Sequence, residues 1–198
     1  MPAVIMLVCA VAVAVGAWNL WNERTQSHPP GILAPAAPYQ KNLARPVDLP
    51  RSGYRLEARA EFEITARVIS RSRFRFDPMA HFMPVDFALG WGRMSDSAVL
   101  DRISCSQSHR FYACNWDSLD IIHPDEFRTH SANMHMIPDT PKIEEALLRV
   151  RRGQVVTVRG LLVDVFLPDG SGARTSMTRD DSGPGGCEII LVVGLDVS

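Results

Sequence analysis

The stretch that decides the fold is RLEARAEFEITARVIS, residues 55–70, which alternates apolar and polar side chains along its whole length. Every second residue is apolar, namely Leu56, Ala58, Ala60, Phe62, Ile64, Ala66 and Val68. A period of two places these side chains on one face of a β-strand and the charged side chains on the other. The sequence therefore predicts a long strand with one face in a core and one in water.

Two later segments are also typical of strands. In GQVVTVRGLLVDVFL, residues 153–167, the apolar positions change phase at Gly160, from Val156 and Val158 to Leu161, Val163 and Val165. A change of phase at a glycine is what a β-bulge produces, and bulges bend strands around small barrels. The last segment, CEIILVVGLDV, is apolar on both faces, which predicts a central strand.

Helices are fewer. Thr140 can cap a helix that begins at Pro141, carries an apolar stripe and ends at Gly153, the stripe being Ile143, Ala146, Leu147 and Val150. SDSAVLDRI, residues 95–103, predicts a second, shorter helix. Because strands outnumber helices, the expected class is α+β, mainly β, over residues 54–198. The expected architecture is a small OB-like β-barrel with one capping helix, with a β-sandwich as the alternative.

The N-terminus contains an unbroken apolar run, AVIMLVCAVAVAVGAW, which Leu20 and Trp21 extend. About twenty apolar residues span the hydrocarbon core of a bilayer, and Trp18 and Trp21 suit its aromatic interface. Residues 1–21 are therefore predicted to form a transmembrane anchor that contacts lipid through residues 3–21. A cleaved signal peptide is the alternative, although the positively charged n-region is missing.

Between the apolar run and the first predicted strand, residues 22–53 are rich in proline and poor in large apolar side chains. Such a segment buries too little surface to offset its ordering entropy. We expect a semi-rigid spacer that holds the domain away from the bilayer. The preferred location is the bacterial inner membrane, with a single span and the C-terminal domain in the periplasm.

Composition excludes several function classes. The net charge is −1, so no global field attracts nucleic acid. SRSRFRF, residues 70–76, interleaves arginine with phenylalanine as nucleic-acid-binding strands do, but a solvated strand face is the simpler interpretation. The chain contains no P-loop, G-x-G-x-x-G, H-E-x-x-H or C-x-x-C sequence, and no cofactor is expected.

The segment THSANMHMIP, residues 129–138, contains two histidines and two methionines. His130 and His135 are five residues apart, which does not converge them on one ion in a strand or a helix, so no metal site is expected. On an extended segment Asn133 and His135 share one face. We expect these two to form a surface binding site together with Arg179, Asp180 and Asp181.

Two cysteines, Cys105 and Cys114, flank a segment that reads as a hairpin turning at His109–Arg110. In that register the two thiols face each other, which predicts a disulfide outside the cytoplasm. Two buried thiols are the alternative, because His-Arg is unusual in a two-residue turn.

Cys187 follows a glycine-rich turn with Arg179, Asp180 and Asp181 nearby. This setting is compatible with an activated nucleophile. The nearest upstream histidine is His135, which belongs to a different predicted element. The simpler interpretation is that Cys187 is the first core residue of the last strand.

Taken together, DFALGWGRMSD, SQSHRFY, SANMHMIP, RRGQVVTVRGLLVDV and SMTRDDSGPGGCE resemble a group of bacterial proteins with an N-terminal membrane segment and an OB-like, β-rich domain. The resemblance covers about residues 54–197. It implies one exported domain on a single anchor, and it implies no activity and no catalytic residue.

The first functional hypothesis is a non-catalytic binding or accessory module that engages an envelope protein or polymer. An anchor and a compact domain, without a convergent set of catalytic residue types, favour it. The alternative is a Cys187-dependent envelope enzyme for acyl transfer or thiol hydrolysis.

Overall fold

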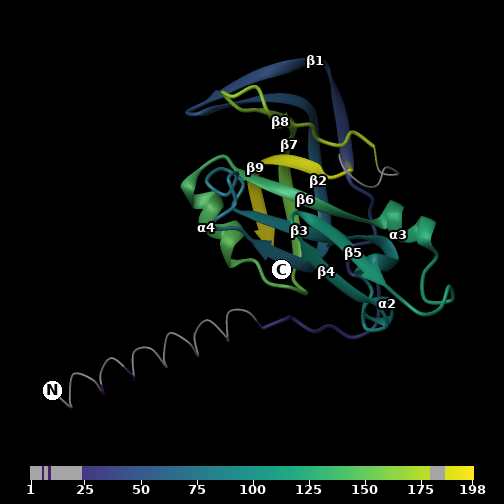
Figure 1. Ribbon diagram of the computed structural model, residues 1–198. Coiled ribbons are helices and arrows are strands. Elements are labelled where there is room, and N and C mark those ends of the chain that lie inside the picture. The colour runs from purple at the N-terminus through teal and green to yellow at the C-terminus, as the bar shows by residue number, and fades with distance from the viewer. Residues whose placement is uncertain (1–5, 7–8, 10–23, 179–185) are drawn as a thin grey trace.

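The computed structural model describes residues 6, 9, 24–178 and 186–198, and it is mainly β (Figure 1). Its strands are β1 (Tyr39–Arg51), β2 (Tyr54–Arg73), β3 (Val85–Gly90), β4 (Ser104–Ser108), β5 (Phe111–Asn115), β6 (Ser131–Pro138), β7 (Val155–Phe166), β8 (Gly172–Ala173) and β9 (Glu188–Val197). Its helices are the 3-10 turn η1 (Gly92–Ser95), α2 (Ser97–Leu100), α3 (Pro124–His130) and α4 (Pro141–Arg149). The predicted mainly β class is confirmed.

Seven strands form one sheet in the order β1-β2-β3-β6-β9-β7-β8, and β4 pairs with β5 in a separate hairpin. The long strand β2 pairs with β3 on one side and also with β7, over residues 55–67. Among the strand pairings of the described residues, only that of β6 with β9 is parallel. Because β1 and β8 each have one partner and are edges, the sheet as a whole is not a closed barrel.

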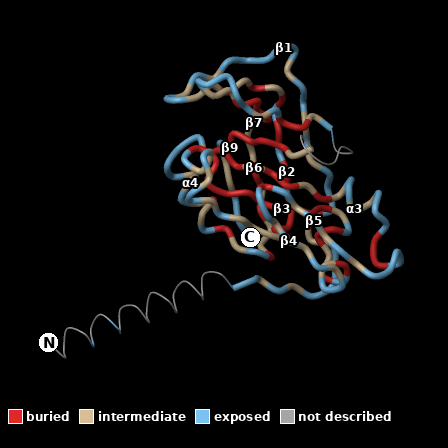
Figure 2. The backbone as a smooth tube through the Cα atoms, viewed as in Figure 1, coloured by how far each residue is buried: buried red, intermediate tan, exposed pale blue. Residues whose placement is uncertain are grey.

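The alternating segment forms β2 as predicted, and its apolar residues are buried. They pack in the main core with Trp91, Met134, Met136 and Leu147. Figure 2 shows this buried material along β2, β3 and β6. A period of two in the sequence thus accounts for the strand that the rest of the sheet is built on.

The bulge that the sequence predicts within β7 is not found, because the extra residue at each register shift lies on the partner strand, Arg59 of β2 and Val193 of β9. The shift against β9 occurs at Gly160, which pairs with Val192 while Arg159 pairs with Gly194. A Cβ atom at this position would lie 2.0 Å from the carbonyl oxygen of Leu191. Glycine is therefore required because the two backbones approach too closely for any side chain.

The main predicted helix is α4, capped by Thr140, whose side chain accepts from the backbone N–H of Ile143. It ends at Arg149, a turn earlier than the sequence pattern indicates. Leu147 is completely buried against the core. The segment 95–103 forms only one α-helical turn, α2, capped by Asp96. The helix α3 was not predicted from the sequence.

The prediction of a spacer over residues 22–53 is wrong for the described part of that segment. Residues 39–51 form β1, paired along β2. Upstream, Gln26 N donates to Arg152 O at 2.8 Å, and the backbone N–H groups of Leu33 and Ala34 donate to Ser95 Oγ. An edge strand tolerates proline because one of its sides needs no N–H donor, so proline content alone misjudged the segment.

The predicted transmembrane anchor, residues 1–21, lies almost entirely outside the described residues. Within the described residues, no helix is long and apolar enough to span a membrane.

Candidate functional site

The hairpin of β4 and β5 turns at His109 and Arg110, which have φ angles of 50° and 65°. Cys105 and Cys114 face each other in its register, as expected, and are joined by a disulfide. The positive φ values at two non-glycine residues cost about 1 kcal/mol or more each. The surroundings of the turn must offset that cost.

Arg110 supplies the compensation through its side chain, which is only 9% exposed. Its guanidinium donates to Asp86 Oδ1 at 3.0 Å, to both carboxylate oxygens of Asp77 and to the carbonyl oxygen of Met83. The same group stacks 3.9 Å above the ring of Phe74. The hydrogen bonds from Arg110 also hold the pKa of the Asp77 carboxyl below its ordinary value. Arg110 therefore fixes the hairpin tip onto the sheet.

Asp86 is the second residue of β3 and is completely buried. Its partner in the antiparallel register with β6 is His135, and their atoms Oδ2 and Nδ1 are 2.8 Å apart. Its other oxygen, Oδ1, accepts from Arg110. One buried carboxylate thus joins an arginine and a histidine on the side of β3 and β6 that faces away from the main core.

His135 carries the most informative electrostatic shift in the described chain. Burial alone lowers the pKa of its imidazole, but the Asp86 carboxylate and Cys187 together outweigh burial and raise the pKa from 6.5 to about 9. The ring is therefore protonated at neutral pH.

Cys187 reaches this histidine because β9 pairs in parallel with β6, with Met134 opposite Glu188 and His135 opposite Ile189. The half-buried Cys187 lies just before β9 and interacts with the His135 ring. Asn133 contacts the same sulfur, with its Nδ2 atom 3.8 Å from Sγ. Two elements that are more than fifty residues apart in the sequence meet at one thiol.

Asn133 also ties the thiol to the hairpin. Its Nδ2 donates to the carbonyl oxygen of Arg110 at 2.8 Å, and its Oδ1 accepts from Gln107 at 2.6 Å. The amide orientation is therefore fixed by contacts on both sides. Asn133 and His135 consequently hold Cys187 between them in a defined place.

The structure brings together only part of the predicted binding site. Asn133 and His135 lie at this cluster, whereas Arg179, Asp180 and Asp181 lie outside the described residues. Two further members, Asp86 and Arg110, were not identified from the sequence. The available signal for Asp86 was a carboxylate inside the otherwise apolar VDFALG.

A metal centre finds no support in the described chain, where no group of three or more histidine, cysteine, aspartate or glutamate residues could hold an ion. His130 packs near Trp91 and His123 caps α3. His130 and His135 therefore lie in different environments.

The cluster has the order carboxylate, imidazole and thiol, through Asp86, His135 and Cys187. A protonated imidazole next to sulfur stabilises negative charge that develops there, and a carboxylate behind the imidazole fixes the ring orientation. In this arrangement an oriented histidine lies next to a half-buried thiol. In comparisons with known proteins, no family model, no curated protein and no solved structure matches the chain.

Proposed function

We propose that the protein is a Cys187-dependent enzyme of the cell envelope, acting by acyl transfer or thiol hydrolysis. The observation that carries the proposal is the contact of His135 with both Cys187 and the buried Asp86. The sequence favoured a non-catalytic module because no histidine lay close to Cys187 along the chain. The parallel pairing of β6 with β9 supplies that histidine.

In the proposed reaction, Cys187 Sγ forms a bond to an acyl carbon while the bond to the leaving group breaks. The thiol proton passes to water as Sγ attacks, and the protonated His135 gives its own proton to the leaving group. Water or a second acceptor then attacks the acyl-cysteine, and the thiol is restored. Asp86 holds the ring in place throughout.

We further propose that the domain has an OB-like fold. The pairings β2–β3, β3–β6, β6–β9, β9–β7 and β7–β2 return to their starting strand, and α4 connects β6 to β7. This order, with one parallel pair, supports a five-stranded Greek-key arrangement to which β1 and β8 are added.

The proposed location is the periplasmic side of the bacterial inner membrane, with a single anchor through residues 3–21. The Cys105–Cys114 disulfide supports an oxidising compartment. The resemblance to membrane-anchored bacterial proteins with an OB-like domain agrees with this proposal, as does the apolar character of residues 3–18.

The second candidate is the non-catalytic binding module for an envelope protein or polymer. The enclosure of Arg110 favours it, because its guanidinium donates to Asp77, Asp86 and the carbonyl oxygen of Met83, all within the protein. In that case the cluster only locks the hairpin, and Asn133 and His135 belong to a docking surface.

The alkylation rate of Cys187 tests the reactive thiol. In a Cys9→Ser background, Cys187 is the only free cysteine, because Cys105 and Cys114 are bridged. Replacing His135 with glutamine is expected to slow iodoacetamide labelling of the folded protein at pH 7 about tenfold or more, equivalent to about 1.4 kcal/mol or more. Mass spectrometry of the labelled peptide measures the rate.

The same two proteins labelled in guanidinium provide the control, because the thiol then has no neighbours and both should react alike. Equal rates for the folded proteins would show that His135 does not assist the sulfur, and the binding-module candidate would stand.

A further inference from the structure

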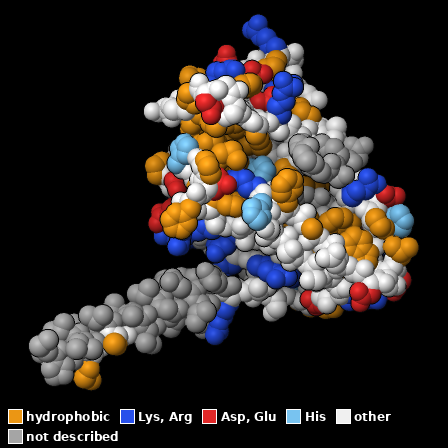
Figure 3. All heavy atoms as spheres, viewed as in Figure 1, with side chains coloured by type: hydrophobic (Ala, Val, Ile, Leu, Met, Phe, Trp, Pro, Cys, Tyr) orange, Lys and Arg blue, Asp and Glu red, His pale blue; other side chains and the backbone are white. Residues whose placement is uncertain are grey.

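Four arginines line a surface groove of about 420 Å³ between the end of β2 and the loop that precedes β7. They are Arg71, Arg73, Arg151 and Arg152, with Thr25 and Ser70 between them. Arg73, Arg151 and Arg152 take part in no ion pair with any described residue. Figure 3 shows Lys and Arg side chains gathered at the lower left of the domain, below α4.

The fold holds this groove in place. Arg71 donates to the carbonyl oxygens of Leu148 and Val150 at the end of α4. Across the groove, Arg152 accepts from Gln26 through its backbone, and the His28 ring lies 2.9 Å from the carbonyl oxygen of Gly153. Positive charge in a chain whose net charge is −1 is thus concentrated where the N-terminal segment joins the domain.

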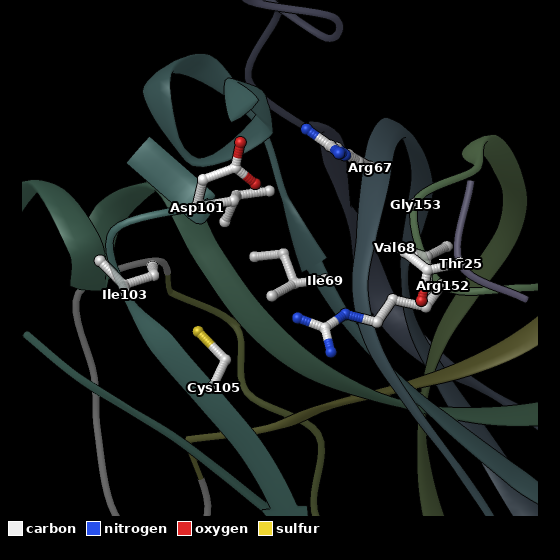
Figure 4. A pocket seen from close by; sticks show the side chains of 10 residues that line it. Thr25, Arg67, Val68, Ile69, Asp101, Ile103, Cys105, Arg152 and Gly153 are labelled. Atoms are coloured by element: carbon white, nitrogen blue, oxygen red, sulfur yellow. The ribbon is translucent and has the colours of Figure 1, made fainter. Parts of the chain in front are cut away.

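A smaller cavity of about 70 Å³ adjoins the groove, and both are lined by Thr25 and Arg152. Figure 4 shows Thr25, Arg152 and Gly153 on one side of this cavity and Asp101, Ile103 and Cys105 on the other. Arg67 also lines it, and the buried Nε atom of Arg67 has no hydrogen-bond partner in the described chain. The basic surface therefore continues inward from the groove.

The position of Thr25 limits the distance between the groove and the N-terminal apolar run. Only three residues lie between Thr25 and Trp21, the last residue of the apolar run, and the four residue steps from Trp21 to Thr25 span at most about 14 Å of extended chain. If residues 3–21 cross a bilayer, the groove lies within that reach of the lipid headgroups. The expected 32-residue spacer would have allowed a much larger separation, but the packing of residues 26–34 on the domain removes it.

We infer that the arginine groove docks the domain directly onto anionic phospholipid headgroups at the membrane surface. Guanidinium groups bind phosphate oxygens through paired N–H donors, and basic side chains next to a span are attracted by an anionic leaflet. The inference rests on the proposed anchor. With the groove docked, the domain lies on the bilayer surface instead of being held away from it by a spacer.

Energy transfer between the full-length chain and labelled lipid tests this docking. A donor dye is attached at Ser198→Cys in a Cys9→Ser, Cys187→Ser background, because Ser198 pairs with Val155 close to the groove. The chain is reconstituted into vesicles of phosphatidylcholine alone or with phosphatidylglycerol, each with headgroup-labelled acceptor. Transfer should be higher with phosphatidylglycerol and should fall as salt is added.

Replacing Arg73, Arg151 and Arg152 with glutamine should lower the ratio of docked to undocked domains about a hundredfold, at roughly fivefold for each positive charge removed. A matched variant with glutamine at the exposed Arg45, Arg102 and Arg128 should behave as wild type. Addition of inorganic phosphate should reduce transfer only at concentrations that also screen charge.

Equal transfer on both lipids, or an unchanged triple variant, would overturn the docking inference while leaving the anchor intact. A chain that does not sediment with any vesicle would instead refute the anchor, and the docking of the groove on a membrane would be refuted with it.

Discussion

Replacing Arg110 with methionine is expected to lower the free energy of unfolding by about 3–5 kcal/mol, because the completely buried Asp86 would lose one of its two charged partners. The hairpin tip would also lose its anchor, leaving two residues at positive φ without compensation. Chemical denaturation monitored by tryptophan fluorescence measures the change.

Two controls separate this effect from a general loss of charge. Arg110→Lys keeps the charge but not the several N–H contacts, so an intermediate loss is expected. Arg149→Met removes a solvent-exposed arginine paired with Glu145 and should change stability little. If Arg110→Met were no more destabilising than Arg149→Met, the buried ion network would not hold the hairpin.

The stability of the folded protein should fall as the pH rises from 6.5 toward 9. The folded state holds the His135 proton more tightly than the unfolded state, since Asp86 and Cys187 raise its pKa to about 9 against burial. The stabilisation is complete below pH 6.5 and is lost as the pH passes 9. The raised pKa corresponds to about 3 kcal/mol of linked stability.

His135→Gln should remove this component, so the difference in unfolding free energy between wild type and variant should shrink across that window. A difference that is constant from pH 6 to pH 9 would contradict the protonated state assigned to His135.

Local patterns in the sequence predicted much of the fold. The alternation of residues 55–70 predicted β2, and the cap at Thr140 predicted α4. Each of these depends on residues that are neighbours in the chain, where periodicity and backbone sterics act directly. The phase change at Gly160 coincides with the register shift against β9, but the extra residue lies on β9 and not on β7. The edge strand β1 was missed because its prolines outweighed its weak apolar pattern.

The candidate site was less accessible because it depends on contacts between distant segments. The sequence indicates no contact between His135 and Cys187, because the two residues belong to different predicted elements. The parallel pairing of β6 with β9 brings them together. Arginine is unusual in a two-residue hairpin turn, but the buried contacts of Arg110 with Asp86 and Asp77 explain its presence here. Local rules predicted unfavourable turn chemistry at the place where tertiary contacts compensate for it.

Trapping of an acyl group on the protein tests the central claim most directly. The Cys9→Ser protein is mixed with an activated acyl ester, and intact mass with peptide mapping follows the adduct. One acyl group per chain should form on Cys187, and His135→Gln should slow its formation about a hundredfold or more. Adducts scattered over several residues, or acylation of Cys187 at the same rate without His135, would contradict a nucleophile assisted by this histidine.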